Sequence, residues 1–278
     1  MKVFYRVKNT ADGDIIPYSI NIYNALDGAI QLGLETKKFF NVNDIIDEYE
    51  KGDIVLDGID QVGFCLKKFD IEPQKFNYPD ILKPYLGREI WYDTINHISN
   101  NEKLWSKGYF VKPVKEKVFS GHVISSIKDL IGCGSCYENY EVLVSEPIDV
   151  VYECRGFVYY DELKDLRPYK GDWKYMKYMD TELIDLAMKD WKKWDERPNA
   201  CSLDFGVIKR PHKIVVSKFN NGNPKKIDEY YEDGYDTVLI EGNLPYALGC
   251  YGYYGLNYIK LISAYISQVS NVKDELKF

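Results

Sequence analysis

Two short β-forming segments, residues 203–207 and 237–243, constrain this chain most, because each holds polar oxygen atoms within an apolar run. Residues 237–243 are predicted to form a strand, on which Glu241 and Asn243 face the same side because side chains alternate. Asp204 lies in the second run, which extends over residues 201–208. If the two strands pair, these three side chains form one cluster of hard oxygen ligands, the kind that Mg²⁺ prefers. The alternative is an ordinary strand end with solvated polar side chains.

The bulk composition indicates a well-packed protein without general affinity for nucleic acid. Hydrophobic residues make up 45% of the 278 positions, enough for two domains with cores of their own. The net charge is −7, whereas phosphate binding needs clustered lysine and arginine. The N-terminus lacks the apolar run of a signal peptide, and no stretch is long and apolar enough to span a membrane. We therefore expect a cytoplasmic protein.

The six cysteines are scattered along the chain, and we expect them to be reduced in the cytoplasm. Cys133 and Cys136 form a CxxC pair, but no second pair accompanies it. A structural zinc site needs about four ligands. We therefore expect a turn between two elements here, with a metal or redox role as the alternative.

The first hundred residues alternate strand-like and helix-like patterns, which indicates a small, largely parallel α/β domain. The expected strands are 3–7, 36–40, 53–57 and one near residue 90, and the expected helices are 20–32, a short run near 45, 58–69 and a short one after residue 78. No glycine fingerprint of a dinucleotide fold follows these strands, so no such cofactor is assigned.

The pattern changes near residue 100, where the polar connector 99–103 suggests a boundary between domains 1–100 and 101–278. Longer β runs follow, with few helices, and this favours an antiparallel α+β domain. The expected strands are 109–114, 141–146, 150–160, 201–208, 213–219 and 236–242, and the expected helices are roughly 181–192 and 252–269.

Residues 107–121 combine lysines with small residues in a way that suits phosphate binding. Lys112 lies within an apolar strand-like run, where a partly buried lysine needs an anionic partner. Lys117, Ser120 and Gly121 follow in a turn whose backbone amides could approach phosphate oxygens. The alternative is a solvated edge strand, because lysines commonly blunt sheet edges.

Two further segments carry paired charges or a lysine before a glycine. On the run 150–158, Glu153 and Arg155 share one face, so they either pair with each other or hold a ribose hydroxyl and a phosphate or carboxylate. Farther on, Lys170 precedes Gly171. The segment 144–149 contains Pro147 and is predicted to be a hinge.

In this order and spacing, the chain resembles the ATP-grasp superfamily. The resemblance rests on Phe-Val-Lys112-Pro with a following Ser-Gly, Glu153-Cys-Arg155-Gly-Phe-Val, Tyr-Lys170-Gly, Leu-Asp204-Phe-Gly-Val and Ile-Glu241-Gly-Asn243. The pattern is similar to a phage-associated clade recognised by one arginine and two lysines. Residues 1–100 resemble the Rossmann-like pre-ATP-grasp domain. The expected fold is therefore α+β, an ATP-grasp-like domain after an N-terminal α/β domain.

The resemblance implies an ATP-dependent carboxylate–amine ligase that works through an acylphosphate. By that analogy Lys112 and Lys170 bind ATP phosphates, and the Glu146 segment meets the adenine. Glu153 is a candidate for ribose contact, and Arg155 stabilises the transferring phosphoryl group or the acceptor carboxylate. The remaining assignments are Mg²⁺ ligation by Asp204, Glu241 and Asn243, and a phosphate-covering loop formed by Lys117, Ser120 and Gly121. Because that loop has a single glycine, its flexibility departs from the family pattern.

Such a mechanism needs no protein nucleophile, since positioning and charge neutralisation supply most of the catalysis of phosphoryl transfer. The partners would be ATP, a carboxylate and an amine, the last two being small molecules, peptides or proteins. A kinase is disfavoured because no His-Arg-Asp loop or Gly-rich loop accompanies residues 204–206, and no Walker A sequence occurs.

Two alternatives belong to other classes: a non-catalytic nucleotide-binding module and a protein-interaction module with a tyrosine-rich surface. Tyrosines gather after residue 243, namely Tyr246, Tyr251, Tyr253, Tyr254 and Tyr258. Tyrosine is a favoured residue at interfaces. Because this group directly follows the predicted metal strand, we interpret it as helix packing and the wall of an acceptor pocket.

Overall fold

The computed structural model describes residues 1–73, 78–114, 118–133, 138–220 and 223–277. The chain forms two units, each built from separate stretches of sequence. Unit 1 comprises Met1–Tyr85, Val151–Val207 and Thr237–Phe278, and unit 2 comprises Leu86–Val150 and Ile208–Asp236. No helix of the described residues is both long and apolar enough to cross a membrane.

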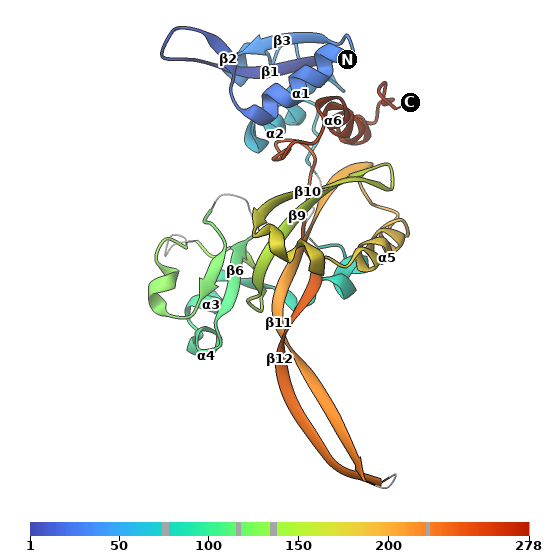
Figure 1. Cartoon of the computed structure of the whole chain (residues 1–278). Helices are drawn as coiled ribbons and strands as arrows, with labels where there is room; N and C mark the ends of the chain where they lie inside the picture. The colour runs from blue at the N-terminus through green and yellow to red at the C-terminus, as the bar shows by residue number, and fades with distance from the viewer. Residues whose placement is uncertain (74–77, 115–117, 134–137, 221–222, 278) are drawn as a thin grey trace. The chain divides into compact units, whose positions relative to one another are not determined.

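Unit 1 begins with the small α/β layer that the sequence predicts (blue in Figure 1). Strand β1 (Lys2–Asn9) is parallel to β3 (Glu35–Phe39) and β4 (Ile54–Leu56), with β2 (Ile15–Pro17) antiparallel at its other end. Helices α1 (Ile20–Gln31) and α2 (Ile59–Lys67) lie within the predicted ranges, and a short helical turn, η1 (Val42–Asp44), precedes β4. The predicted largely parallel sheet is confirmed. Strand β2 was not predicted, because three residues are too few to show a strand pattern.

The C-terminal helix α6 (Gly255–Val269) packs against α1, far from it in sequence (Figure 1). A Cβ atom on Gly28 would lie 2.1 Å from the Gly255 carbonyl oxygen, so only glycine permits this approach. One hydrophobic core joins residues of β1, α1 and α6, including Phe4, Ala25 and Tyr265. The end of the chain therefore completes the core that its beginning starts.

A second sheet has the strand order β10-β9-β11-β12. Its strands are β9 (Asp149–Tyr159), β10 (Glu162–Gly171), β11 (Ala200–Asn220) and β12 (Asn223–Asn243), and η4 (Trp173–Tyr178) and α5 (Thr181–Trp191) intervene in sequence. The predicted pairing of the Asp204 strand with the Glu241 strand is confirmed, because β11 and β12 are neighbours.

The separate strands expected over 201–208 and 213–219 are wrong, since both belong to the single strand β11. Likewise, the strand expected over 236–242 is only the end of the long β12. Ion pairs Lys209–Asp233 and Lys213–Glu229 bridge the two strands at a constant register. The two strands continue through polar residues because β11 and β12 pair with each other and satisfy each other's backbone hydrogen-bonding groups. An apolar pattern in the sequence does not reveal such pairing.

Unit 2 contains an antiparallel sheet with the order β5-β8-β6-β7. The strands are β5 (Ile90–Thr94), β8 (Glu141–Ser145), β6 (Tyr109–Pro113) and β7 (His122–Ile124). The short helices of this unit are α3 (Ile95–Ser99), α4 (Glu102–Trp105) and η3 (Ile127–Leu130). The helical turn η2 (Asp80–Tyr85) belongs to unit 1. Their core includes Ile98, Val111 and Val144.

The expectation that the strand near residue 90 joins the first sheet is wrong, because β5 pairs with β8. A strand's partner is a tertiary choice that local sequence does not encode. The expected connector 99–103 links α3 to α4. The domain boundary near residue 100 stays a prediction.

Candidate active site

The centre of the candidate site is Asp204, which β11 places in the interior of unit 1. Every residue from Cys201 to Ile208 is buried, and Asp204 itself is 0% exposed. A buried carboxylate is costly unless it is paired and hydrogen-bonded. The sequence therefore requires a cationic partner for Asp204 from a neighbouring element.

Arg155 of the adjacent strand β9 supplies that partner through a two-point contact. Its Nε donates to Asp204 Oδ1 at 2.9 Å and its Nη2 donates to Oδ2 at 2.7 Å. Nη1 donates to the Gly249 carbonyl at 3.3 Å. Such planar, charge-assisted pairs are among the strongest in proteins. Of the alternatives left open for Arg155, pairing with Glu153 is excluded by this geometry.

The electrostatics of the pair follow from its burial. Burial raises the pKa of the Asp204 carboxyl, the Arg155 hydrogen bonds and charge oppose this shift, and the charge of Glu241 adds to it. For Arg155, burial lowers the pKa, but the hydrogen bonds and charge of Asp204 outweigh it, so the guanidinium stays charged.

Two tyrosine rings surround the same guanidinium. The Arg155 guanidinium carbon lies 5.4 Å from the Tyr169 ring centroid and 5.3 Å from that of Tyr251. The two rings stack with centroids 5.0 Å apart and an interplanar angle of 18°. Cation–π attraction acts within about 6 Å of a ring centroid. Both rings therefore contact the guanidinium, while Asp204 binds its Nε–Nη2 edge in the side-on geometry.

Glu153 lies two residues before Arg155 on β9 and binds two residues of β10. Its Oε2 accepts from the Tyr169 hydroxyl and its Oε1 from Lys170 Nζ, both at 2.6 Å. The β9–β10 register shifts between Pro168 and Lys170, so Tyr169 is an extra residue in the strand. A bulge re-aims side chains, and here it lets two consecutive residues reach one carboxylate.

Gly171 explains why a glycine follows Lys170. Its φ is +92°, and a Cβ atom there would lie 2.2 Å from the Val151 carbonyl oxygen. A side chain is therefore excluded by both conformation and space. In the Tyr169-Lys170-Gly171 motif, the tyrosine forms the bulge, the lysine is exposed and the glycine ends the strand.

Glu241 and Asn243 lie at the end of β12, next to the strand of Asp204. They share a face, since Asn243 Nδ2 donates to Glu241 Oε1 at 3.3 Å. Because this contact uses the amide nitrogen of Asn243, its amide oxygen stays an acceptor. Each Asp204 oxygen also keeps lone-pair capacity beside its bond to Arg155. The three side chains therefore suit a magnesium ion in chemistry, as two carboxylates and an amide.

Within the ranges the structure describes, no three His, Cys, Asp or Glu side chains gather closely enough to hold a metal. The predicted magnesium set has only two such residues, so this finding does not test it. The metal assignment stays a prediction.

The remaining predicted nucleotide-binding residues belong to unit 2. Lys112 lies on β6, paired in register with Leu143 of β8. Gly121 passes directly beside it, because a Cβ atom on Gly121 would lie 2.8 Å from Lys112 Cβ. The Ser120 carbonyl accepts a hydrogen bond from His122 Nδ1 at 2.9 Å. Glu146 follows β8 and accepts from the Glu89 backbone N–H at 3.4 Å.

Lys117 and Cys136 lie outside the described residues. Cys133 is buried, with its Sγ 3.3 Å from the Asp129 carbonyl oxygen. The predicted turn at this CxxC pair, and the alternative of a metal or redox role, both stay predictions.

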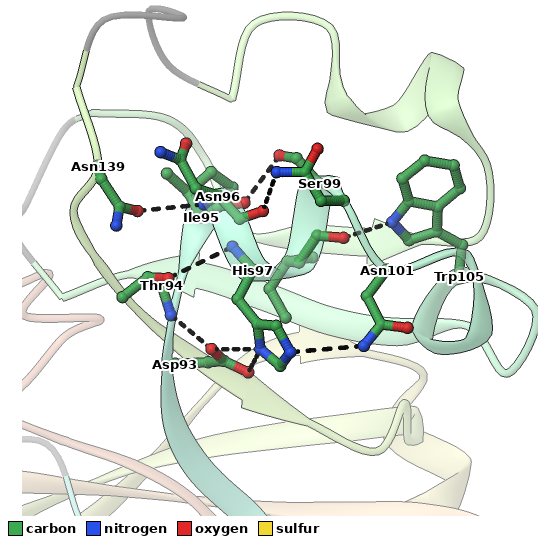
Figure 2. A network of polar contacts seen from close by, with 11 residues as sticks. Asp93, Thr94, Ile95, Asn96, His97, Ser99, Asn101, Trp105 and Asn139 are labelled. Atoms are coloured by element: carbon green, nitrogen blue, oxygen red, sulfur yellow. Dashed lines mark hydrogen bonds and ion pairs between the residues drawn. The ribbon is translucent and has the colours of Figure 1, made fainter.

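Figure 2 shows another polar network of unit 2, around α3. The Asp93 carboxylate contacts His97 Nδ1 at 2.8 Å, and the Thr94 hydroxyl accepts from the His97 backbone N–H at 3.3 Å. Trp105 Nε1 donates to the Ile98 carbonyl at 2.7 Å. These bonds satisfy groups at the ends of a five-residue helix. We assign the network a structural role.

The tyrosines after residue 243 divide into distinct environments. Tyr246 and Tyr258 line a pocket in unit 1, and Tyr253 stacks on Phe157 with centroids 4.1 Å apart. Tyr254 is exposed and donates to Gln31 at 2.7 Å. Helix packing is therefore confirmed for the buried members, and the acceptor-wall hypothesis stays a prediction.

Sequence reasoning missed the roles of Tyr169 and of the Gly249 carbonyl. Tyr169 adjoins the predicted Lys170, but residues 162–171 were not predicted to form a strand, so no orientation was predicted for either side chain. The register shift that overrides alternation left no signal in the sequence.

Comparison with known proteins identifies the family. Residues 85–261 match the family model described as ATP-grasp domain, R2K clade family 2. No curated protein matches the sequence. Among solved structures, D-alanine–D-alanine ligase from Bacillus anthracis, complexed with ATP, has a TM-score of 0.50 at 12% identity, covering 97% of this chain and 96% of that one. This likeness shows the fold.

Structural matches with lower TM-scores cover a similar share of this chain. N5-carboxyaminoimidazole synthase from Aspergillus clavatus has a TM-score of 0.48 at 8% identity, covering 98% of this chain and 77% of that one. The synthetase of that name from Staphylococcus aureus has a TM-score of 0.45 at 10% identity, with the same coverages of 98% and 77%. With a family model matching well over half its length, the chain belongs to the ATP-grasp superfamily, in R2K clade family 2.

Proposed function

We propose that the protein is an ATP-dependent ligase that joins a carboxylate to an amine through an acylphosphate. The observation that carries the proposal is the arrangement on neighbouring strands: the buried Arg155–Asp204 pair, the Glu153–Lys170 pair beside it, and Glu241 with Asn243 on β12. Phosphoryl transfer depends mainly on positioned charge, and these strands supply both signs of charge on rigid elements.

In this reaction a carboxylate oxygen attacks the γ-phosphorus of ATP, and ADP leaves. The amine nitrogen then attacks the acyl carbon, the carbon–oxygen bond to phosphate breaks, and the nitrogen loses a proton to give the amide. Asp204, Glu241 and Asn243 would hold Mg²⁺, which neutralises phosphate charge when bound. No side chain has to act as a nucleophile.

The cationic residues have separate roles in the proposal. Arg155 is fixed on three sides, by Asp204, the Gly249 carbonyl and two tyrosine rings, so it suits stabilisation of the transferring phosphoryl group. Lys170 is 67% exposed at its side chain but tethered by Glu153, so it suits contact with a phosphate. Both oxygens of Glu153 are already bonded, which favours positioning of Lys170 over contact with ribose.

The proposal also keeps the expected roles of the other predicted nucleotide-binding residues. Lys112 would bind phosphate, Lys117, Ser120 and Gly121 would form the loop over it, and Glu146 would meet the adenine. The phage association of the clade and a cytoplasmic location belong to the same proposal, in which the carboxylate and the amine are small molecules, peptides or proteins.

A thermal-melt comparison tests the nucleotide site without knowledge of the substrates. A ligand that binds only the native state raises Tm by mass action. ADP with Mg²⁺ should raise the Tm of the wild type, and Glu241→Ala should lose the Mg²⁺-dependent part. Absence of any rise at millimolar ADP would contradict the proposal. A rise without ATP turnover on any carboxylate–amine pair would favour a non-catalytic nucleotide-binding module.

A further inference from the structure

Unit 1 contains a pocket of about 230 Å³ beside the α/β layer. Its wall combines the ends of β1 and β4, the start of α1, and residues that follow β12. None of these residues was predicted to bind a ligand, except as part of the tyrosine group after residue 243. The pocket is small, so it suits a ligand with few non-hydrogen atoms.

One end of the pocket is charged, and the sheet register explains why. Parallel pairing matches Tyr5 with Leu56, so the next residues along the two strands, Arg6 and Asp57, emerge side by side at the carboxyl end of the sheet. Arg6 Nη1 donates to Asp57 Oδ1 at 3.2 Å, a single contact, and the guanidinium lies 4.1 Å from the Tyr18 ring centroid. The pocket therefore presents one anion and one cation next to each other.

The hydrogen bonds that Arg6 and Asp57 form within the described part of the chain leave both side chains able to bond a ligand. The side chain of Asp57 is only 3% exposed, yet both of its hydrogen bonds, from Arg6 and from the Gly58 backbone N–H, end on Oδ1. Arg6 donates from Nη1 to Asp57, and a guanidinium has five N–H groups. Asp57 lines the pocket, and its Oδ2 is not among the buried polar atoms without a partner, so this oxygen can accept from a ligand or water there.

Another part of the pocket wall is apolar, although Ser19 and Asn21 also line the pocket. Ile22 and Ala25 of α1, Val55 of β4 and Ile262 of α6 line it. These side chains belong to the core shared by α1 and α6, so this end is rigid. An apolar group of a few carbon atoms would be buried there.

The pocket wall continues into the candidate active site through one short segment. Tyr246 and Ala247 line the pocket, and Ala247 has a φ of +60°, a strained conformation for a non-glycine residue. Two residues on, the Gly249 carbonyl accepts from Arg155. The same segment thus contacts both the pocket and the proposed phosphoryl-binding arginine.

We propose that this pocket binds a free α-amino acid with a small apolar side chain. Asp57 Oδ2 accepts from the ammonium group, Arg6 donates to the carboxylate, and the side chain enters the apolar end. The adjacent opposite charges select a zwitterion over a ligand with a single charge. This assignment rests on the proposed ligase function, in which the amino acid is one of the two organic substrates.

Isothermal titration calorimetry on the full chain without nucleotide tests the assignment. The probes are glycine, alanine, valine and leucine, with N-acetylalanine and alaninamide as matched ligands that lack one charge each. At least one free amino acid should bind, and loss of either charge should weaken binding about 10- to 100-fold, as expected for charge-assisted hydrogen bonds. No binding by any free amino acid at millimolar concentration overturns the proposal, as does equal binding of the blocked analogues.

Variants of the protein provide the second arm. Asp57→Asn and Arg6→Met should each weaken binding to the same degree. Lys37→Met is the matched control and should leave binding unchanged, because Lys37 of the neighbouring strand β3 forms an exposed ion pair with Glu48. The blocked ligands keep the test valid if either variant fails to fold. Mg²⁺-dependent ADP binding without amino-acid binding would overturn this assignment and leave the proposed function intact.

Discussion

Replacing Arg155 with methionine should destabilise the protein in a pH-dependent way. The substitution keeps much of the side-chain volume but leaves Asp204, which is 0% exposed, without its two charge-assisted hydrogen bonds. Removing one partner of a buried ion pair costs about 3–5 kcal/mol. We expect a loss of that size in the free energy of unfolding at pH 8.

The pH dependence follows from the pKa of Asp204. Burial already raises this pKa in the presence of Arg155, and removing Arg155 should raise it further above its unfolded value. A group with a raised folded pKa contributes stability below the unfolded pKa and loses it as pH rises through the folded pKa. The deficit of Arg155→Met should therefore shrink on acidification, by up to about 1.4 kcal/mol per pH unit below the folded pKa.

Urea unfolding followed by tryptophan fluorescence between pH 5.5 and 8 measures this effect. The double variant Arg155→Met/Asp204→Asn removes both charges and should be less destabilised than Arg155→Met alone at pH 8. Arg155→Lys keeps the charge but loses the planar fork, so it should fall between the wild type and Arg155→Met. A deficit that is independent of pH, or a double variant as unstable as Arg155→Met, would refute the argument.

Three further predictions concern stability and nucleotide binding. Gly171→Ala should lower stability by about 1–3 kcal/mol, measured by urea unfolding, because its Cβ atom would meet the Val151 carbonyl; an unchanged midpoint would contradict the geometry. Lys112→Ala should weaken ADP binding in calorimetry while leaving Tm unchanged, and unaltered affinity would remove it from the proposed phosphate site. The Arg197 hydrogen bond lowers the pKa of Asp161, so the stability that ionised Asp161 contributes is present at neutral pH and lost as pH falls through the folded pKa. Asp161→Asn should remove this pH-dependent part of the free energy of unfolding, measured by urea unfolding at a series of pH values.

The local elements follow largely from residue patterns. Helix α1 was predicted from apolar residues at helical spacing, and its N-cap Ser19 accepts from the Ile22 backbone N–H at 3.3 Å. The runs around Lys112, Arg155 and Asp204 were predicted as strands from their β-branched and apolar residues, and all three are strands. Strand β10 was missed, because the charged sequence of Glu162–Gly171 carries no apolar alternation.

Residue patterns predict that Lys112, Arg155 and Asp204 stand on strands, because strand propensity and side-chain alternation are local properties. Which residues these charges pair with depends on the tertiary structure. Arg155 pairs with Asp204, which is 49 residues away, and Glu153 pairs with Lys170 through a bulge. Arg6 and Asp57 meet because two parallel strands pair in one register. A buried charge must find a counter-charge, and which one it finds depends on strand register, a long-range property that no local pattern encodes.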